Sequence, residues 1–199
     1  MSCISTEYFY KKLGFISILR MNLEKLFWSK TKIDILKYLV FRRQWVSMRA
    51  LESEIWWTFP AIKKQIDSLD ESWILDIQKE NSGFSISIKK EFFDLFKQIF
   101  FTALKSNLTH LFETYSIMIN KYFLWKFFWI PIDIDIIIIY QHMEKPQIDE
   151  LKKWISELFR EFFIENVSVV FMSIDEREKR YRLADKFVLQ VIRYFPEIK

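Results

Sequence analysis

The chain has 199 residues, of which 51% are hydrophobic and 28% are charged, and its formal net charge is +4. This apolar content is enough for a hydrophobic core and excludes a disordered chain, while Cys3, as the one cysteine, excludes a disulfide framework and a cysteine-based zinc site. No membrane helix is expected, because Lys126, Asp133 and Asp135 interrupt the most apolar stretch. We therefore expect a cytoplasmic protein of one or two domains.

Three helices are predicted after an N-terminal segment of uncertain origin. Residues 1–20 are expected to be an extension or loose arm, with Met21 as the true start. After it, apolar residues recur at helical spacing in three segments, and Ser29 and Pro60 suit the first turns of the first and the third. The predicted helices span residues 30–43, 47–55 and 59–70.

Two segments after the third helix alternate apolar and polar side chains, as β-strands do. They span residues 74–78 and 84–88, and Glu80-Asn81-Ser82-Gly83 joins them with the composition of a hairpin turn. Three helices followed by a hairpin is the order of a winged helix-turn-helix, so we interpret residues 21–90 as a DNA-binding domain of that type. The alternative is a small α+β domain that binds other proteins.

The second half begins with a long aromatic segment, residues 91–112, which is predicted to be a helical connector and a dimerisation surface. Beyond it strands and helices alternate, which indicates a small α/β domain over residues 113–199 and an α+β chain as a whole. The predicted order in that domain is strand 115–120, strand 132–140, helix 147–163, strand 166–172 and helix 175–195.

Tryptophan and glycine occur in an unusual ratio, with eight Trp and two Gly. Globular chains average about 7% Gly, because turns and helix C-caps need residues that tolerate positive φ. Trp73 lies between a helix and a strand and Trp56-Trp57 in a turn between helices, where glycine is common; Trp154 lies inside a helical pattern. The other tryptophans in predicted connections or helix boundaries are Trp28, Trp45, Trp125 and Trp129.

We hypothesise that the source organism reads UGA as glycine, and that UGA codons of this gene have been translated as tryptophan. The alternative is an AT-rich genome with an unusual amino-acid composition, which the heavy use of Ile, Lys, Phe and Asn also fits. The two readings differ in the codons that they require, since the second needs UGG at every tryptophan position.

Asp133 and Asp135 are separated by one residue in a predicted strand, so both side chains would point to the same face. Two such carboxylates can hold Mg²⁺ against a nucleotide, and the segment resembles the Asp-x-Asp strand of the nucleotidyltransferase fold. In that fold a Gly-Ser pair ends the preceding strand and a later strand supplies a third carboxylate. Asn120-Lys121 and Ser168 stand at those places here, so the motif reads as degenerate, and neither catalysis nor a resident metal or cofactor is expected.

Two further motifs carry a resemblance when the tryptophans are read as glycine. One is Leu26-Phe27-Trp28-Ser29-Lys30-Thr31-Lys32, and the other is Val169-Val170-Phe171-Met172-Ser173-Ile174-Asp175-Glu176, followed by Tyr181-Arg182 and Asp185-Lys186-Phe187-Val188. With them, residues 22–199 resemble a bacterial family of winged helix-turn-helix transcriptional regulators with a C-terminal degenerate nucleotidyltransferase-like domain. The resemblance implies transcriptional regulation.

The candidate DNA contacts follow from the winged-helix interpretation. The third helix of such a domain enters the major groove, a helix N-terminus can hold a phosphate, and the hairpin contacts the backbone. The residues predicted to do so are Ser29, Lys30, Thr31, Arg49, Thr58, Pro60, Lys63, Lys64, Lys79, Asn81 and Ser82.

The sequence therefore predicts a DNA-binding transcriptional regulator whose partner is double-stranded DNA and whose C-terminal domain senses a ligand, dimerises or binds another protein. A homodimer is expected, because two-fold symmetric proteins read palindromic sites. Two alternatives stay open: a metal-dependent nucleotidyltransferase that uses Asp133 and Asp135 with Mg²⁺ and a nucleotide, and an antitoxin-like protein-interaction module.

Overall fold

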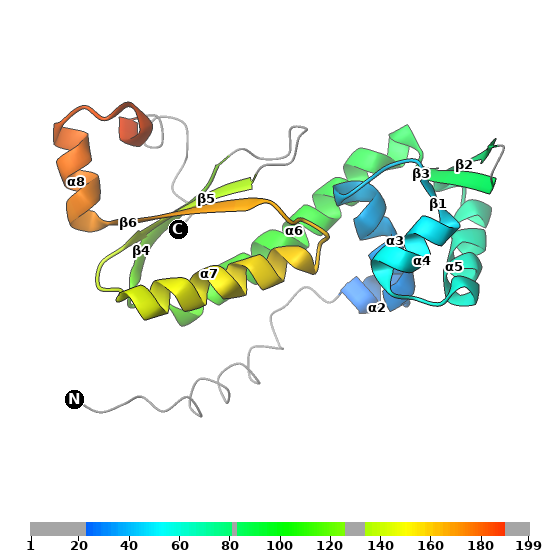
Figure 1. Cartoon of the computed structure of the whole chain (residues 1–199), viewed down its shortest axis with the longest axis horizontal. Helices are drawn as coiled ribbons and strands as arrows, with labels where there is room; N and C mark the ends of the chain where they lie inside the picture. The colour runs from blue at the N-terminus through cyan, green and yellow to red at the C-terminus, as the bar shows by residue number, and fades with distance from the viewer. Residues whose placement is uncertain (1–22, 81–82, 126–133, 190–199) are drawn as a thin grey trace, which may run out of the picture. The chain divides into compact units, whose positions relative to one another are not determined.

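The computed structural model describes residues 23–80, 83–125 and 134–189 and divides the chain into two units, Met1–His110 and Leu111–Lys199 (Figure 1). Each unit has its own sheet and its own helices. The described elements of the first unit are α2 (Leu23–Phe27), α3 (Lys30–Phe41), β1 (Val46–Ser47), α4 (Met48–Ile55), α5 (Phe59–Glu71), β2 (Leu75–Glu80), β3 (Gly83–Ile88) and most of α6 (Lys90–Thr114).

The three predicted helices of this unit are confirmed, with ends that differ by no more than two residues. Serine caps start two of them, since Ser29 Oγ accepts a hydrogen bond from the Lys32 backbone N–H at 3.2 Å and Ser47 Oγ accepts one from Ala50 N–H at 3.2 Å. These caps satisfy amide groups that have no partner within the helix. The local sequence therefore determines where these two helices begin, α3 at Lys30 and α4 at Met48.

The sheet of the first unit has the strand order β1-β3-β2, and all pairs are antiparallel. The predicted hairpin is confirmed by the pairing of Glu80 with Gly83 and of Leu75 with Ile88. The two-residue strand β1 is an addition that the sequence did not indicate, and it lies between α3 and α4 and pairs Val46 with Ile86. Helix, strand, two helices and a two-stranded wing make this unit a winged helix-turn-helix.

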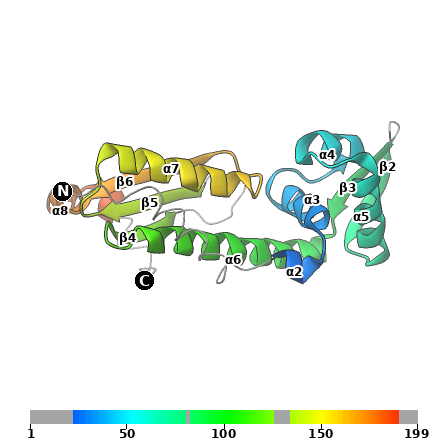
Figure 2. The same cartoon turned by 90° about the horizontal axis from the view of Figure 1, so that it is seen from below.

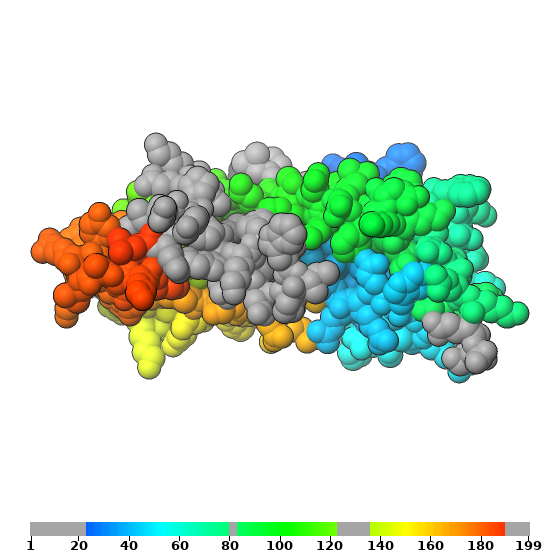
Figure 3. Space-filling model, turned by 90° about the horizontal axis from the view of Figure 1, so that it is seen from above, coloured from blue at the N-terminus to red at the C-terminus, as the bar shows by residue number. Residues whose placement is uncertain are grey.

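The first half of α6 completes the hydrophobic core of this unit. Phe100 is fully buried, and its ring centroid lies 5.9 Å from that of Phe27 and 6.4 Å from that of Phe41. In the space-filling view the residues of α6 (green) lie directly against those of the winged helix (cyan) (Figure 3). The predicted helix over 91–112 is thus confirmed, and its N-terminal part packs as a member of the first unit.

The second unit contains a three-stranded sheet in the order β4-β5-β6, in which β4 and β5 are antiparallel and β5 and β6 parallel. The helix α7 carries Leu151, Ile155 and Phe159 as a buried stripe and lies along the sheet (Figure 2). The described elements are β4 (Ile119–Trp125), β5 (Ile134–Tyr140), α7 (Lys145–Arg160), β6 (Val167–Ser173) and α8 (Ile174–Arg182).

The isoleucine run of β5 is buried on both faces. Ile137 and Ile139 pack with Val170, Ile174 and Phe187 on one face. Ile136 and Ile138 alternate with them and are also fully buried, so they lie in a core on the opposite face. A run of apolar residues without alternation is typical of a strand covered on both sides.

Three predicted elements of this unit are wrong in their bounds. The predicted helix 147–163 ends too late, because α7 ends at Arg160 and Phe163 has a φ of 59°. The predicted strand 115–120 begins too early, because α6 continues to Thr114 and residues 115–118 form a turn in which Met118 and Ile119 N–H both donate to Tyr115 O. The predicted helix 175–195 is interrupted, because α8 ends at Arg182 and Ala184 has a φ of 55°, and its residues 190–195 lie outside the described residues. A new helical stretch follows, in which Asp185 Oδ1 accepts from the amides of the next turn.

None of the helices in the part of the chain that the structure describes is long and apolar enough to cross a membrane.

Candidate DNA interface

The helix α5 presents one buried and one exposed face. Ile62, Ile66 and Leu69 are buried in the core, at the i, i+4, i+7 spacing of a helix that packs on one side. Lys63 and Lys64, next to Ile62 in the sequence, are exposed. Thr58 and Pro60 are also exposed, at the end of α5 that follows the turn from α4. These four predicted contacts therefore lie together on the solvent-facing side of α5 and at its N-terminal end.

The charges along α5 are separated by sign. Lys63 and Lys64 lie in the N-terminal half, whereas Asp67, Asp70 and Glu71 lie in the C-terminal half. A helix is stabilised by acidic residues at its N-terminus and basic residues at its C-terminus, so this order does not serve the stability of α5. It gives the N-terminal half of the helix a positive surface, which suits a polyanion.

The other candidates are distributed over two neighbouring elements. Arg49 is exposed in the first turn of α4, and Lys79 is exposed near the hairpin end of β2. Asn81 and Ser82, predicted as wing contacts, lie outside the described residues. The described part of the predicted interface therefore consists of α5, the start of α4 and one side of the wing.

The predicted phosphate site at Ser29-Lys30-Thr31 lies near the other end of α5. Lys32 Nζ in the same turn donates to Ser68 Oγ at 3.1 Å, and Ser68 is ten residues beyond Thr58, which is about 15 Å along a helix. The Ser29 hydroxyl already accepts a hydrogen bond from the Lys32 backbone N–H, and Thr31 is only 8% exposed. The structure thus does not bring these three residues together with the N-terminal half of α5.

Two contacts that the sequence analysis missed hold the helix-turn-helix in place. Glu52 Oε1 of α4 accepts a hydrogen bond from the Phe59 backbone N–H at 3.0 Å, so a residue of the preceding helix caps α5. Trp57 Nε1 donates to Asp34 Oδ2 of α3 at 2.9 Å. Burial raises the pKa of the Asp34 carboxyl above its usual value, against the lowering effects of this hydrogen bond and of Lys37 and Lys30.

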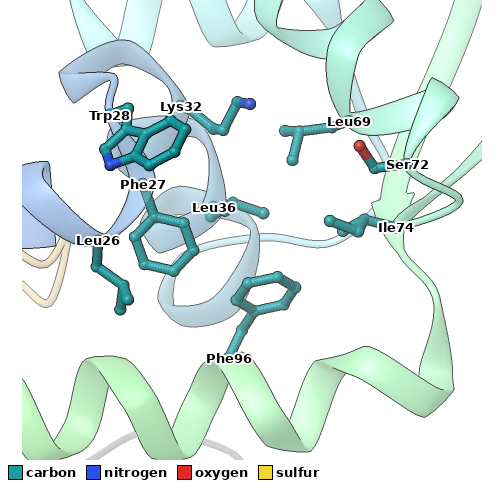
Figure 4. A pocket seen from close by; sticks show the side chains of 9 residues that line it. All are labelled: Leu26, Phe27, Trp28, Lys32, Leu36, Leu69, Ser72, Ile74 and Phe96. Atoms are coloured by element: carbon teal, nitrogen blue, oxygen red, sulfur yellow. The ribbon is translucent and has the colours of Figure 1, made fainter.

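A cavity of about 230 Å³ opens between the helices of the first unit (Figure 4). Its walls are mostly apolar and come from α2, α3, α5 and α6, and Lys32 is the charged residue among them. The residues that line the cavity are Leu26, Phe27, Trp28, Lys32, Leu36, Leu69, Ser72, Ile74 and Phe96.

The nucleotidyltransferase alternative can be examined only in part, because Asp133 lies outside the described residues. Asp135 is paired in register with Ser168 on the parallel strand β6, which is where the sequence analysis placed the missing third carboxylate. Asn120-Lys121 lies inside β4 and not at its end, so the position assigned to a Gly-Ser turn was wrong. No group of three metal-binding side chains occurs among the residues that the structure describes.

Comparison with known proteins gives distant likenesses. No protein-family model matches the chain, and no curated protein matches it. A MarR-like transcriptional regulator from Thermotoga maritima is 12% identical, with a TM-score of 0.43 over 83% of this chain and 99% of that one. The transcriptional regulator BldR from Sulfolobus solfataricus is 18% identical, with a TM-score of 0.36 over 58% of this chain and 86% of that one. At these values the two likenesses decide nothing about the function of this chain.

Proposed function

We propose that the protein is a transcriptional regulator that binds double-stranded DNA through its winged helix-turn-helix. The observation that carries this proposal is the exposed pair Lys63 and Lys64 in the N-terminal half of α5, opposite the buried stripe of the same helix. Residues near the N-terminus of a recognition helix are the ones that reach base edges in the major groove. Basic residues in the N-terminal half of α5 and acidic residues in its C-terminal half interact unfavourably with the helix dipole. Binding to a polyanion therefore explains this arrangement better than the stability of the helix does.

We propose different roles for the basic residues. Lys63 and Lys64 would enter the major groove, where a lysine can donate to guanine O6 and N7 or to a phosphate. Arg49 at the start of α4 and Lys79 on the wing flank that helix and would hold the phosphate backbone, which fixes orientation without reading sequence. Thr58 and Pro60 would approach the bases at the end of α5.

A salt-titrated binding assay tests the proposal, with the promoter of the protein's own gene and a scrambled duplex of equal length. We expect a preference for the promoter that persists near physiological salt, because base contacts are less sensitive to salt than phosphate contacts are. Lys64→Ala should weaken binding and, if it contacts phosphate, reduce the salt slope by about 1. Lys105→Ala, an exposed lysine of α6, is the control for charge alone.

Equal and steeply salt-dependent binding to both duplexes would show a basic surface without sequence recognition. Binding that is unchanged in Lys64→Ala and Lys63→Ala would remove α5 from the interface.

We further propose that the protein acts as a homodimer, with residues 111–199 providing the dimer contact or a site for an effector. A single winged helix reads few base pairs, and a two-fold protein doubles the site. Sedimentation of the full chain at several concentrations, with and without promoter DNA, measures this state. A monomer on a single half-site at saturation would contradict it.

A further inference from the structure

We infer that Trp28, Trp45, Trp56 and Trp73 stand at positions where the natural protein has glycine, encoded by UGA, and that Trp57 and Trp154 are genuine tryptophans. The inference concerns the covalent identity of the chain and does not depend on the proposed function. It narrows the hypothesis drawn from composition, which included Trp57 and Trp125 among the glycine positions.

The backbone at these four residues carries the inference. Their φ angles are 57°, 55°, 60° and 61°, in the left-handed region where a Cβ crowds the following carbonyl oxygen. The other described residues with positive φ besides glycine are Phe163 and Ala184. Tryptophan makes up eight of 199 residues, yet it supplies four of these six positions. Chance does not account for such a concentration of one bulky residue type.

The local hydrogen bonds identify the motifs that require this conformation. Trp73 N–H donates to Asp70 O at 2.8 Å and Ile74 N–H to Leu69 O at 3.1 Å, which are the two bonds of a Schellman motif with Trp73 at its left-handed position. Trp56 is the left-handed C-cap of α4 in the helix-turn-helix turn. Trp28 follows α2, and its N–H donates to Glu24 O at 2.7 Å. Glycine is the usual residue at each such place.

The side chains of three of these residues contribute little in return. Trp28, Trp56 and Trp73 are 90%, 91% and 74% exposed, so little apolar burial offsets their strained backbone, whereas Trp45 is 38% exposed and buries more of its ring. Lys89 Nζ lies 4.7 Å from the centroid of the Trp73 ring, and exposed contacts of this type are weak. Trp28 lines the cavity of the first unit, so glycine at this position would widen the opening.

The remaining described tryptophans have a different character. Trp57 has no positive φ, is partly buried and donates its indole N–H to Asp34. Trp154 lies in the middle of α7 and is partly buried, at a position where glycine would weaken the helix. Trp125 ends β4, where it pairs with Asp135. The structure therefore separates the tryptophans into two classes that composition alone does not distinguish.

The codons of the gene and the peptide masses of the protein from its source cells test the inference directly. We expect UGA at positions 28, 45, 56 and 73 with the mass of glycine in the corresponding peptides, and UGG at 57 and 154. UGG at the four left-handed positions, or peptides with tryptophan there, would overturn it.

A recombinant series gives an independent test of the conformational argument. Glycine at all four left-handed positions should raise Tm by about 2–4 °C for each substitution, because the strain at each is removed. The matched controls Trp57→Gly and Trp154→Gly should lower Tm, since the first removes a part-buried hydrogen bond and the second places glycine in the middle of a helix. If the fourfold variant loses stability as the controls do, glycine is not the residue that this backbone requires.

Discussion

At the scale of the single residue, Asp34 makes the stability of the first unit depend on pH. Its pKa is raised in the folded protein, chiefly by burial. Between the unfolded value of 3.8 and the raised folded value the native state binds more protons than the unfolded state, so the free energy of unfolding falls as pH rises through that window. Asp34→Asn is neutral at every pH, and its side-chain oxygen still accepts from Trp57. We expect this variant to lose that part of the pH dependence in urea titrations. Asp67→Asn, exposed on α5, is the control, and equal slopes in both variants would contradict the assignment.

Tyr115 makes a corresponding contribution in the second unit at alkaline pH. Burial, with a smaller contribution from the charge of Glu150, raises its pKa from 10.0 to about 12. The neutral phenol is therefore favoured in the fold, and the stability that it provides is present below pH 10 and is lost as pH rises from 10 toward 12. Tyr115→Phe cannot ionise, so we expect its thermal unfolding to change less than that of the wild type over this range. Tyr181→Phe, with an exposed ring, is the control, and a wild-type alkaline loss in Tyr115→Phe would contradict the expectation.

At the scale of the element, Glu52 stabilises the first turn of α5. Its carboxylate accepts the Phe59 N–H at 3.0 Å, while Thr58 makes no side-chain cap. Glu52→Ala leaves this amide without its acceptor and removes a negative charge from the positive end of the helix, which costs about 1 kcal/mol of unfolding free energy. Chemical denaturation measures the loss. Glu54→Ala, exposed on the same helix, is the control, and equal effects in both variants would show that the cap contributes nothing.

The sequence predicted those elements that local patterns determine. The stripe Ile62, Ile66 and Leu69 defined α5 and, by exclusion, the outward direction of Lys63 and Lys64. The elements that were missed or wrongly bounded depend on pairing with distant residues, or on helix ends and turns that no glycine or proline marks. The strand β1 has two residues and exists because Val46 pairs with Ile86, forty positions away. The break at Ala184 has no glycine or proline to announce it, and the alternating pattern after Thr114 is that of a strand although the chain turns there.

The candidate interface was predictable to the same extent. Outward-facing residues of α5 follow from helical periodicity, but the position of Ser29-Lys30-Thr31 depends on the packing of α3 against the far end of α5 through Lys32 and Ser68. The contacts of Glu52 and Trp57 were missed because each joins a helix to a residue outside it. The sequence located the turn at Trp56-Trp57, but a turn does not show which side chains meet across it.

At the scale of the whole molecule, the two units have separate cores, and this separation predicts how the chain unfolds. Leu39 in α3 and Phe159 in α7 are both completely buried, each in the core of its own unit. Truncation to alanine costs about 2–5 kcal/mol at such sites. We expect calorimetry to resolve two transitions. Leu39→Ala should lower the temperature of one and Phe159→Ala that of the other, because each substitution removes contacts from the core of one unit.

The helix α6 contributes residues to both units, so it is the element through which one transition would affect the other. A single transition that both variants lower equally would show that α6 joins the two cores into one cooperative fold, and a change in one unit would then reach α5, the proposed DNA-binding helix, in the other.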